Sequence, residues 1–110
     1  MQESEKIVMM VTAASSSEAS TIGKAIVEKR LAACCSIIPN IQSIYWWRGK
    51  VTEDAEVLLM IKTLKSAEAE IINTIKSMHS YELPEMISLT MTGGFDRYFN
   101  WIEENVTGPV

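Results

Sequence analysis

Two long β-type segments joined by a short turn restrict most strongly what this chain can fold into. Cys34–Trp47 is rich in Ile and aromatic side chains, and Val51–Thr63 contains the uninterrupted apolar run Val57–Ile61. The three residues between them, Arg-Gly-Lys at 48–50, have the composition of a tight turn. The pattern predicts a β-hairpin whose arms are longer than the usual strand of about five or six residues.

The segments before and inside the hairpin predict a strand, a helix and a bulge. Ile7–Thr12 is a short apolar run, which is typical of a buried central strand. Ser15 and Glu18 have the spacing of a capping box, which opens a helix by satisfying free backbone N–H groups. Pro39-Asn40 interrupts the first hairpin arm, and we expect a bulge there because proline cannot donate to a strand ladder.

The second half of the chain repeats the helix–strand order and adds a last helix. Ser66 is the predicted cap of a helix with a buried stripe at 71–78, and the alternation at 87–91 predicts a one-sided strand. Asp96 is the predicted cap of a short final helix whose aromatic side chains face inward. The order is β-α-β-β-α-β plus a helix, the ferredoxin-like arrangement of the α+β class. This arrangement serves many functions and indicates none by itself.

The length and composition predict one soluble domain. We expect it to span residues 1–110, with flexible ends at 1–5 and 107–110. Hydrophobic residues make up 47% of the chain, which is typical of a folded globular domain. The core of so small a domain is limited, and this favours self-association. The net charge of −4 argues against nucleic-acid binding, which usually needs a basic face. The longest apolar runs have five residues and a membrane span needs about 20, so we expect no membrane partner.

The cysteines and the N-terminal residues bear on the compartment. Cys34 and Cys35 are neighbours, and adjacent side chains of a strand point to opposite faces. We therefore expect two free thiols that are buried as small hydrophobic side chains, in a reducing compartment. The polar, acidic start has neither the basic region nor the apolar stretch of a secretory signal. A cytoplasmic location is the expectation.

Two stretches have sequences specific enough to suggest a family. They are Ser43–Lys50 around the hairpin turn and the segment His79–Glu85, which reads His-Ser-Tyr-Glu-Leu-Pro-Glu. Weaker supporting segments are Val11–Ala13, Arg30–Cys34, Ile38-Pro39, Leu58–Thr63, Tyr98 and Trp101. Together they resemble the CutA family, also described as divalent-cation tolerance proteins. The resemblance runs from about Ile7 to Glu103, nearly the whole chain.

The resemblance implies a homotrimer in which long hairpins pair between subunits. It also implies a role in tolerance of or response to metal ions, with binding of copper or another divalent cation, no required cofactor and no conventional enzymatic activity. The chain departs from the family at three positions. Ala14 and Ser80 stand where proline is frequent, and Val11 stands where some copper-binding members have cysteine. A soft-metal ligand is therefore missing here.

His79 is the only histidine, and Glu82 and Glu85 follow it at steps of three. A neutral imidazole often ligates copper or zinc, and carboxylates can complete such a site. One histidine with two glutamates is far from a dense metal motif, so a hydrogen-bonding histidine is the alternative. The resemblance favours metal binding at these three residues.

Acidic residues follow the hairpin turn, and the simplest interpretation of Glu53, Asp54 and Glu56 is a solvated strand start. The functional hypothesis places Glu53 and Glu56, with Lys62 or Tyr81, in a cleft between subunits. Such a cleft suits a cation or a small ligand.

Tyr45, Trp46 and Trp47 form an aromatic cluster beside the turn. Because side chains alternate along a strand, at least one ring faces away from the core of its own subunit. Large exposed aromatics usually mark an interface, so we expect these residues at a trimer contact. Ligand stacking and packing within one chain are the alternatives.

Other functional classes fit the sequence less well. A PII-like regulatory trimer shares the fold and binds small ligands between subunits, but it depends on a long mobile loop where this chain has a tight turn. An RNA-recognition module needs aromatics on its central strands, and Ile7–Thr12 and Val57–Thr63 have none. No nucleophile–base pair or phosphate-binding loop is visible, so we predict no enzymatic activity. Burial between subunits predicts unusual heat resistance.

Overall fold

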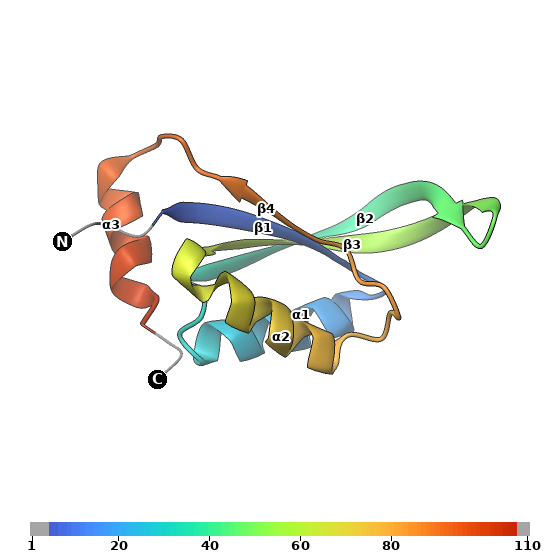
Figure 1. The fold of residues 1–110 in the computed structure, drawn as a ribbon, viewed down its shortest axis with the longest axis horizontal. Helices are drawn as coiled ribbons and strands as arrows, with labels where there is room; N and C mark the ends of the chain where they lie inside the picture. Colours follow the sequence, from blue (N-terminus) through green and yellow to red (C-terminus); the bar gives the residue numbers. More distant parts are fainter. Residues whose placement is uncertain (1–4, 108–110) are drawn as a thin grey trace.

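The computed structural model describes residues 5–107, which form one sheet with three α-helices and a short 3-10 turn (Figure 1). The elements are β1 (Lys6–Ala13), α1 (Ser16–Glu28), β2 (Cys34–Trp47), β3 (Lys50–Leu64), η1 (Lys65–Ala67), α2 (Glu68–Met78), β4 (Met86–Thr90) and α3 (Asp96–Asn105). This order confirms the predicted β-α-β-β-α-β pattern with an added helix.

The four strands form one sheet in the order β2-β3-β1-β4, and every neighbouring pair is antiparallel. Figure 1 shows α1 and α2 on one side of the sheet, with α3 at the end where β1 begins. The β2–β3 hairpin extends beyond the other strands at the opposite end. The arrangement is the predicted ferredoxin-like α+β fold.

The core lies between the sheet and the two helices α1 and α2. Alternate residues of β1 and β3, such as Met9 and Ile61, are fully buried because they point toward these helices. Ile22, Ile26 and Ile75 meet them from the helical side. Apolar residues recur at every third or fourth position along the helices and at every second position along the strands. Each element therefore has one apolar face, and these faces meet in a single layer.

The opposite face of the sheet is also apolar, although it lies away from α1 and α2. Cross-strand partners share a face, so the pairs of Met10 with Met60 and with Ile87 place all three side chains there. Leu89 is 50% exposed and Ile87 48% exposed on β4, and Ile38 of β2 is 40% exposed. We call this surface, with Val8, Met10, Leu58 and Met60 at its centre, the open face.

A bulge in β2 changes which side chains reach the open face. Ile38 pairs with Leu58, but the next pair is Ile41 with Glu56, so β2 contains one extra residue at the predicted Pro39-Asn40 position. A shift of one residue moves every later side chain to the other face. Beyond the bulge the odd-numbered residues of β2 therefore share the face of Glu56.

The hairpin closes in a two-residue turn. Trp47 pairs with Lys50, and the residues between them have positive φ angles, 51° at Arg48 and 79° at Gly49. Two positive φ values match the twist of a tight hairpin, and glycine adopts such an angle without steric cost. The predicted tight turn is confirmed.

Three predicted helix features differ in outcome. Ser15 caps α1 as expected, with its Oγ accepting the Glu18 N–H at 3.1 Å. Ser66 does not cap α2, because a 3-10 turn occupies 65–67 and Ala67 becomes the N-cap. Asp96 is the first residue of α3 rather than its cap, which is Phe95.

The aromatic residues of α3 do not face inward as predicted. Tyr98 and Trp101 are both more than a third exposed and stack on each other at 5.4 Å, whereas Ile102 fills the buried position. Phe99 packs against the core beside Ile102, and Val106, just after the helix, is buried with it.

The chain ends were predicted to be flexible at 1–5 and 107–110. Residues 1–4 and 108–110 lie outside the described residues. Glu5 accepts a backbone hydrogen bond from Lys65, and Thr107 donates one to Arg30. Within residues 5–107 no helix has the length and apolar character needed to cross a membrane.

Candidate functional site

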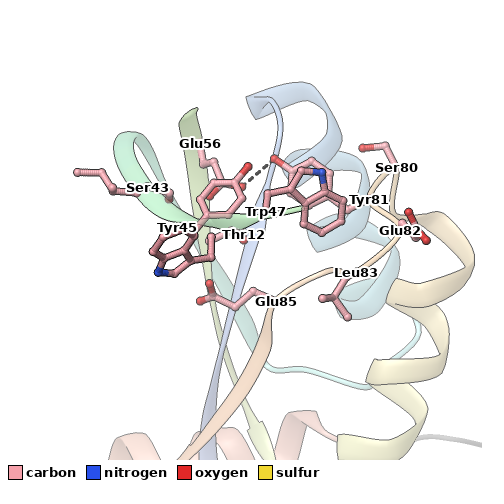
Figure 2. A pocket seen from close by; sticks show the side chains of 12 residues that line it. Thr12, Ser43, Tyr45, Trp47, Glu56, Ser80, Tyr81, Glu82, Leu83 and Glu85 are labelled. Atoms are coloured by element: carbon pink, nitrogen blue, oxygen red, sulfur yellow. Dashed lines mark hydrogen bonds between the residues drawn. The ribbon is translucent and has the colours of Figure 1, made fainter. Parts of the chain in front are cut away.

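A pocket of about 660 Å³ lies between residues 43–47 of the hairpin, next to its turn, and the loop 79–85 that connects α2 to β4. Figure 2 shows side chains from both segments around it. The bulge in β2 explains the hairpin side, because it places Ser43, Tyr45 and Trp47 on the same face as Glu56. The lining residues are Thr12, Ser43, Ile44, Tyr45, Trp46, Trp47, Glu56, Ser80, Tyr81, Glu82, Leu83 and Glu85.

Glu56 is the buried carboxylate of this pocket, with only 7% of its surface exposed. Its Oε2 accepts a hydrogen bond from the Tyr81 hydroxyl at 2.7 Å, drawn as a dashed line in Figure 2. Burial, together with this carboxylate, raises the pKa of the Tyr81 hydroxyl well above its usual range. Tyr81 therefore remains a hydrogen-bond donor to Glu56 at neutral and moderately alkaline pH.

The outer wall of the pocket carries further aromatic and charged groups. The Tyr45 hydroxyl donates to Asp54 across the hairpin, and this bond raises the pKa of Tyr45. The guanidinium of Arg48 lies 5.4 Å from the centre of the Trp47 ring and 3.6 Å from Glu82. A cation over an aromatic face is an attractive arrangement. The rim of the pocket is therefore both aromatic and acidic.

His79 begins the loop and uses both ring nitrogens within the protein. Nε2 lies 2.7 Å from the Thr12 carbonyl oxygen, which can only accept, so Nε2 carries the proton. Nδ1 then accepts the Tyr81 backbone N–H at 3.0 Å. The histidine thus fixes the loop to the end of β1 as a neutral ring, which is the hydrogen-bonding alternative left open by the sequence.

The predicted metal ligands do not form a ready metal site. Among residues 5–107 no group of three or more His, Cys, Asp or Glu side chains is arranged to hold a metal ion. Glu82 reaches toward Arg48 instead, and Glu85 lines the pocket. Metal binding at His79, Glu82 and Glu85 stays a prediction, and it requires His79 to exchange a hydrogen bond for the metal.

The predicted inter-subunit residues fall in three places within one chain. Glu56 and Tyr81 meet in the pocket, whereas Glu53 lines a shallower hollow along the hairpin. Lys62 lies six residues along β3 from Glu56, and its Nζ bonds to Ser36 Oγ at 2.6 Å. Their meeting across a subunit boundary stays a prediction.

The aromatic cluster is exposed within one chain, as expected of an interface. Trp46 is 74% exposed, and Tyr45 and Trp47 are each more than a third exposed. Tyr45 and Trp47 also line the pocket, which keeps ligand stacking open. Packing into the core of the same chain is not what the structure shows.

Sequence reasoning missed several contributors to the site. Glu18 of α1 accepts the Ser80 backbone N–H at 2.8 Å and holds the loop from the helical side. Thr12 and Leu83 line the pocket, and Arg48 covers Trp47 at its rim. These contacts join distant segments, so local spacing carries no signal for them.

The two cysteines are free thiols on opposite faces of β2, as predicted. Both are partly exposed rather than buried, because β2 lies at the edge of the sheet. Cys35 faces α1 next to Gly23, and burial raises the pKa of its thiol to about 11. Cys34 lies on the open face beside Lys62, with 4.0 Å between Sγ and Nζ.

The fold and the site define a class: a ferredoxin-like protein with an extended hairpin and an acidic, aromatic pocket beside it. Residues 7–105 match the family of CutA1 divalent ion tolerance proteins. The chain therefore belongs to the CutA1 family, which confirms the resemblance seen in its motifs.

Individual relatives support the assignment. The divalent-cation tolerance protein CutA of Thermus thermophilus is 43% identical over 89% of this chain and 95% of its own length. The mouse protein CutA is 45% identical over 86% of this chain. The chain spans 95% of the length of the Thermus relative, 60% of the chloroplastic CutA of Arabidopsis thaliana and 53% of the mouse protein.

Solved structures show the same fold. The CutA1 structure from Thermus thermophilus has a TM-score of 0.91 and 41% identity, covering 93% of this chain and 99% of that one. CutA1 from Oryza sativa has a TM-score of 0.92 and 37% identity, covering 96% of both chains. A structure from Archaeoglobus fulgidus at 36% identity, covering 93% and 99% of the two chains with a TM-score of 0.90, is described as a periplasmic divalent cation tolerance protein.

Proposed function

We propose that this protein acts as a homotrimer in the cellular response to divalent metal ions, in the cytoplasm and without enzymatic activity of its own. The names of its relatives support the link to divalent cations. The observation that supports assembly is the open face, an apolar sheet surface left exposed in a single chain. Ile38, Ile87 and Leu89 on it are each at least 40% exposed.

Assembly is the simplest way to bury this surface. A single small domain rarely leaves a contiguous apolar patch in water, and such a patch usually marks an interface. The strands β2 and β4 at the two edges of the sheet also offer backbone groups for pairing with another chain. The partly exposed rings of Tyr45 and Trp47 extend the same surface along the hairpin. Subunits that meet here enclose the pocket as the cleft predicted for a cation or small ligand.

Direct binding of copper or zinc is expected to be modest. His79 is the one imidazole in the chain, and Val11 replaces the cysteine of copper-binding members. A metal at Nδ1 must displace the Tyr81 N–H, and this exchange weakens binding. The PII-like alternative is not favoured, because the hairpin closes with two residues and has no long loop within the described chain.

Mass measurement combined with metal titration tests the proposal. We expect light scattering at micromolar concentration to give three times the chain mass of 12.3 kDa. We expect calorimetry to show weak Cu(II) binding, and this binding should weaken as the pH is lowered because the imidazole becomes protonated. His79→Ala should lose this binding. A monomer in solution would refute assembly, and equal copper affinity in both proteins would remove His79 as the ligand.

A further inference from the structure

The pocket between the hairpin and the loop 79–85 has the chemistry of a cation site. Its lining includes the aromatic residues Tyr45, Trp46 and Trp47 of the hairpin, and its charged lining residues are all carboxylates. Among the described lining residues there is no lysine or arginine. The volume of about 660 Å³ lies in the range of small-molecule sites.

One carboxylate oxygen in this pocket is available for a ligand. Glu56 is more than nine-tenths buried, and its Oε2 is engaged by the Tyr81 hydroxyl. No hydrogen bond from the described residues reaches its Oε1, and no buried side-chain oxygen or nitrogen among these residues lacks a partner, so Oε1 is open to water in the pocket. A carboxylate oxygen that faces water can exchange a water hydrogen bond for one from a ligand. A charged N–H group of a ligand that reaches Oε1 makes a strong, charge-assisted hydrogen bond.

Arg48 shows that the outer wall already attracts an organic cation. Its guanidinium lies over Trp47 and near Glu82 at 5.4 and 3.6 Å. Both charged side chains are about three-quarters exposed, so this ion pair is weak and easily exchanged. A ligand cation can therefore use the same ring at little cost.

An organic cation suits the pocket better than a metal ion. A divalent metal needs several converging oxygen or nitrogen ligands, and the described residues contain no such group. Aromatic walls instead attract ammonium groups and pack against alkyl chains. The hydroxyls of Thr12 and Ser43, which line the same pocket, can accept further N–H bonds.

We propose that this pocket binds a small alkylamine in its protonated form, with the primary ammonium at Glu56 and the alkyl chain against Tyr45 and Trp47. The proposal names the ligand class of the proposed cleft and rests on the proposed function, since neighbouring subunits must leave the pocket open. The ammonium end of such a ligand donates N–H hydrogen bonds to the carboxylate. Its alkyl chain packs against the aromatic rings.

Calorimetry with hexylammonium chloride tests the site directly, with hexan-1-ol as the neutral match of the same length. We expect hexylammonium to bind and hexanol to bind at least about tenfold more weakly, because the alcohol lacks the charge that Glu56 recognises. Glu56→Gln keeps the acceptor for Tyr81 and should weaken hexylammonium at least about tenfold. Glu85→Gln, from the other wall, should also weaken it if Glu56→Gln does not fold.

Two further variants separate the site from general charge effects. Glu53→Gln removes the same charge outside the pocket and should leave the affinity within about twofold of the parent, since exposed charges at a distance are screened. Arg48→Asn removes the resident cation and should tighten binding a few-fold. Asparagine tolerates the positive φ at this position, so the turn is kept.

The outcomes are distinct. Equal binding of the amine and the alcohol would overturn the proposal, and so would equal losses in Glu53→Gln and Glu56→Gln. Light scattering on the same samples separates this inference from the proposed function. A trimer that does not bind hexylammonium refutes the cation pocket alone. A monomer that binds it with the expected variant pattern supports the pocket and refutes assembly.

Discussion

Glu18 links two parts of the chain that are far apart in the sequence. Its Oε1 accepts the Ala14 N–H at 3.1 Å, and its Oε2 accepts the Ser80 N–H at 2.8 Å. Burial raises the pKa of this carboxyl, but the hydrogen bonds from Ser80 and Ala14 together outweigh burial and set it below the ordinary value of 4.5. The charged carboxylate therefore fastens the pocket loop to the start of α1.

Replacing this carboxylate should make stability less dependent on pH. A group whose pKa is lowered on folding adds stability above its ordinary pKa and loses it as the pH falls through the folded value. We expect Glu18→Gln to lower the free energy of unfolding at pH 7 by about 1 kcal/mol, the usual size of a lost cap. The difference should shrink as the pH falls below 4.5. Urea unfolding at fixed protein concentration measures it.

The matched control is Glu70→Gln on the exposed side of α2. It removes the same charge without touching the loop, and its stability should stay within about 0.5 kcal/mol of the parent. If Glu18→Gln differs from the parent equally at all pH values, the charge of Glu18 is not what holds the loop.

The sequence could predict only half of this arrangement. The spacing of Ser15 and Glu18 gave the helix start, and the Ser15 cap is confirmed. In a capping box, the Glu18 carboxylate would accept the Ser15 backbone N–H. Here it accepts the backbone N–H groups of Ala14 and Ser80 instead. The Ser80 bond spans 62 residues, and no local pattern encodes a contact between segments that only the fold brings together.

Among the elements, the β2–β3 hairpin has two features, its turn and its bulge, that could be predicted from the sequence. The composition at 48–50 predicted the turn, and Pro39 predicted the bulge, because both depend on backbone properties of single residues. The consequence of the bulge was not predictable. Which face Tyr45 and Trp47 occupy depends on the count of paired residues on β3, and that register is a tertiary feature.

The turn makes a direct prediction about Gly49. Its φ of 79° is rarely adopted by residues with a side chain, but an added Cβ would meet no described atom within 4 Å. Gly49→Ala should therefore lower the free energy of unfolding by about 1 kcal/mol through backbone strain alone. Gly93→Ala is the matched control, because its added Cβ also meets nothing within 4 Å and its φ is not positive. An equal effect of the two substitutions in chemical unfolding would contradict the role of the positive φ.

For the whole molecule, the fold was predictable, and the surface that we propose for assembly was predictable only in part. The hydrophobic periods of strands and helices determine the order of elements. The aromatic cluster at 45–47 indicated an exposed surface. The open face was not visible in advance, since β4 reads as a strand with one buried face and only the sheet order shows that Ile87 and Leu89 lie on the exposed side.

Assembly also predicts how stability depends on concentration. When folding and association are coupled, the melting temperature rises with protein concentration. We expect melting well above the roughly 45–65 °C that is common for mesophile domains, with a clear rise on concentrating the protein. Calorimetric scans over a hundredfold range of concentration measure this. A melting temperature near 50 °C that does not change on dilution would mean that contacts between chains contribute little to stability.

The most direct test of the central claim is the mass in solution of an open-face variant beside a control. Leu89→Glu places a charge on the open face, and Ala69→Glu places the same charge on the exposed side of α2. Light scattering should give a trimer for the parent and for Ala69→Glu, and a monomer or a mixture for Leu89→Glu, because burying an unpaired charge opposes association. A trimer of unchanged stability in Leu89→Glu would show that subunits do not meet through this face.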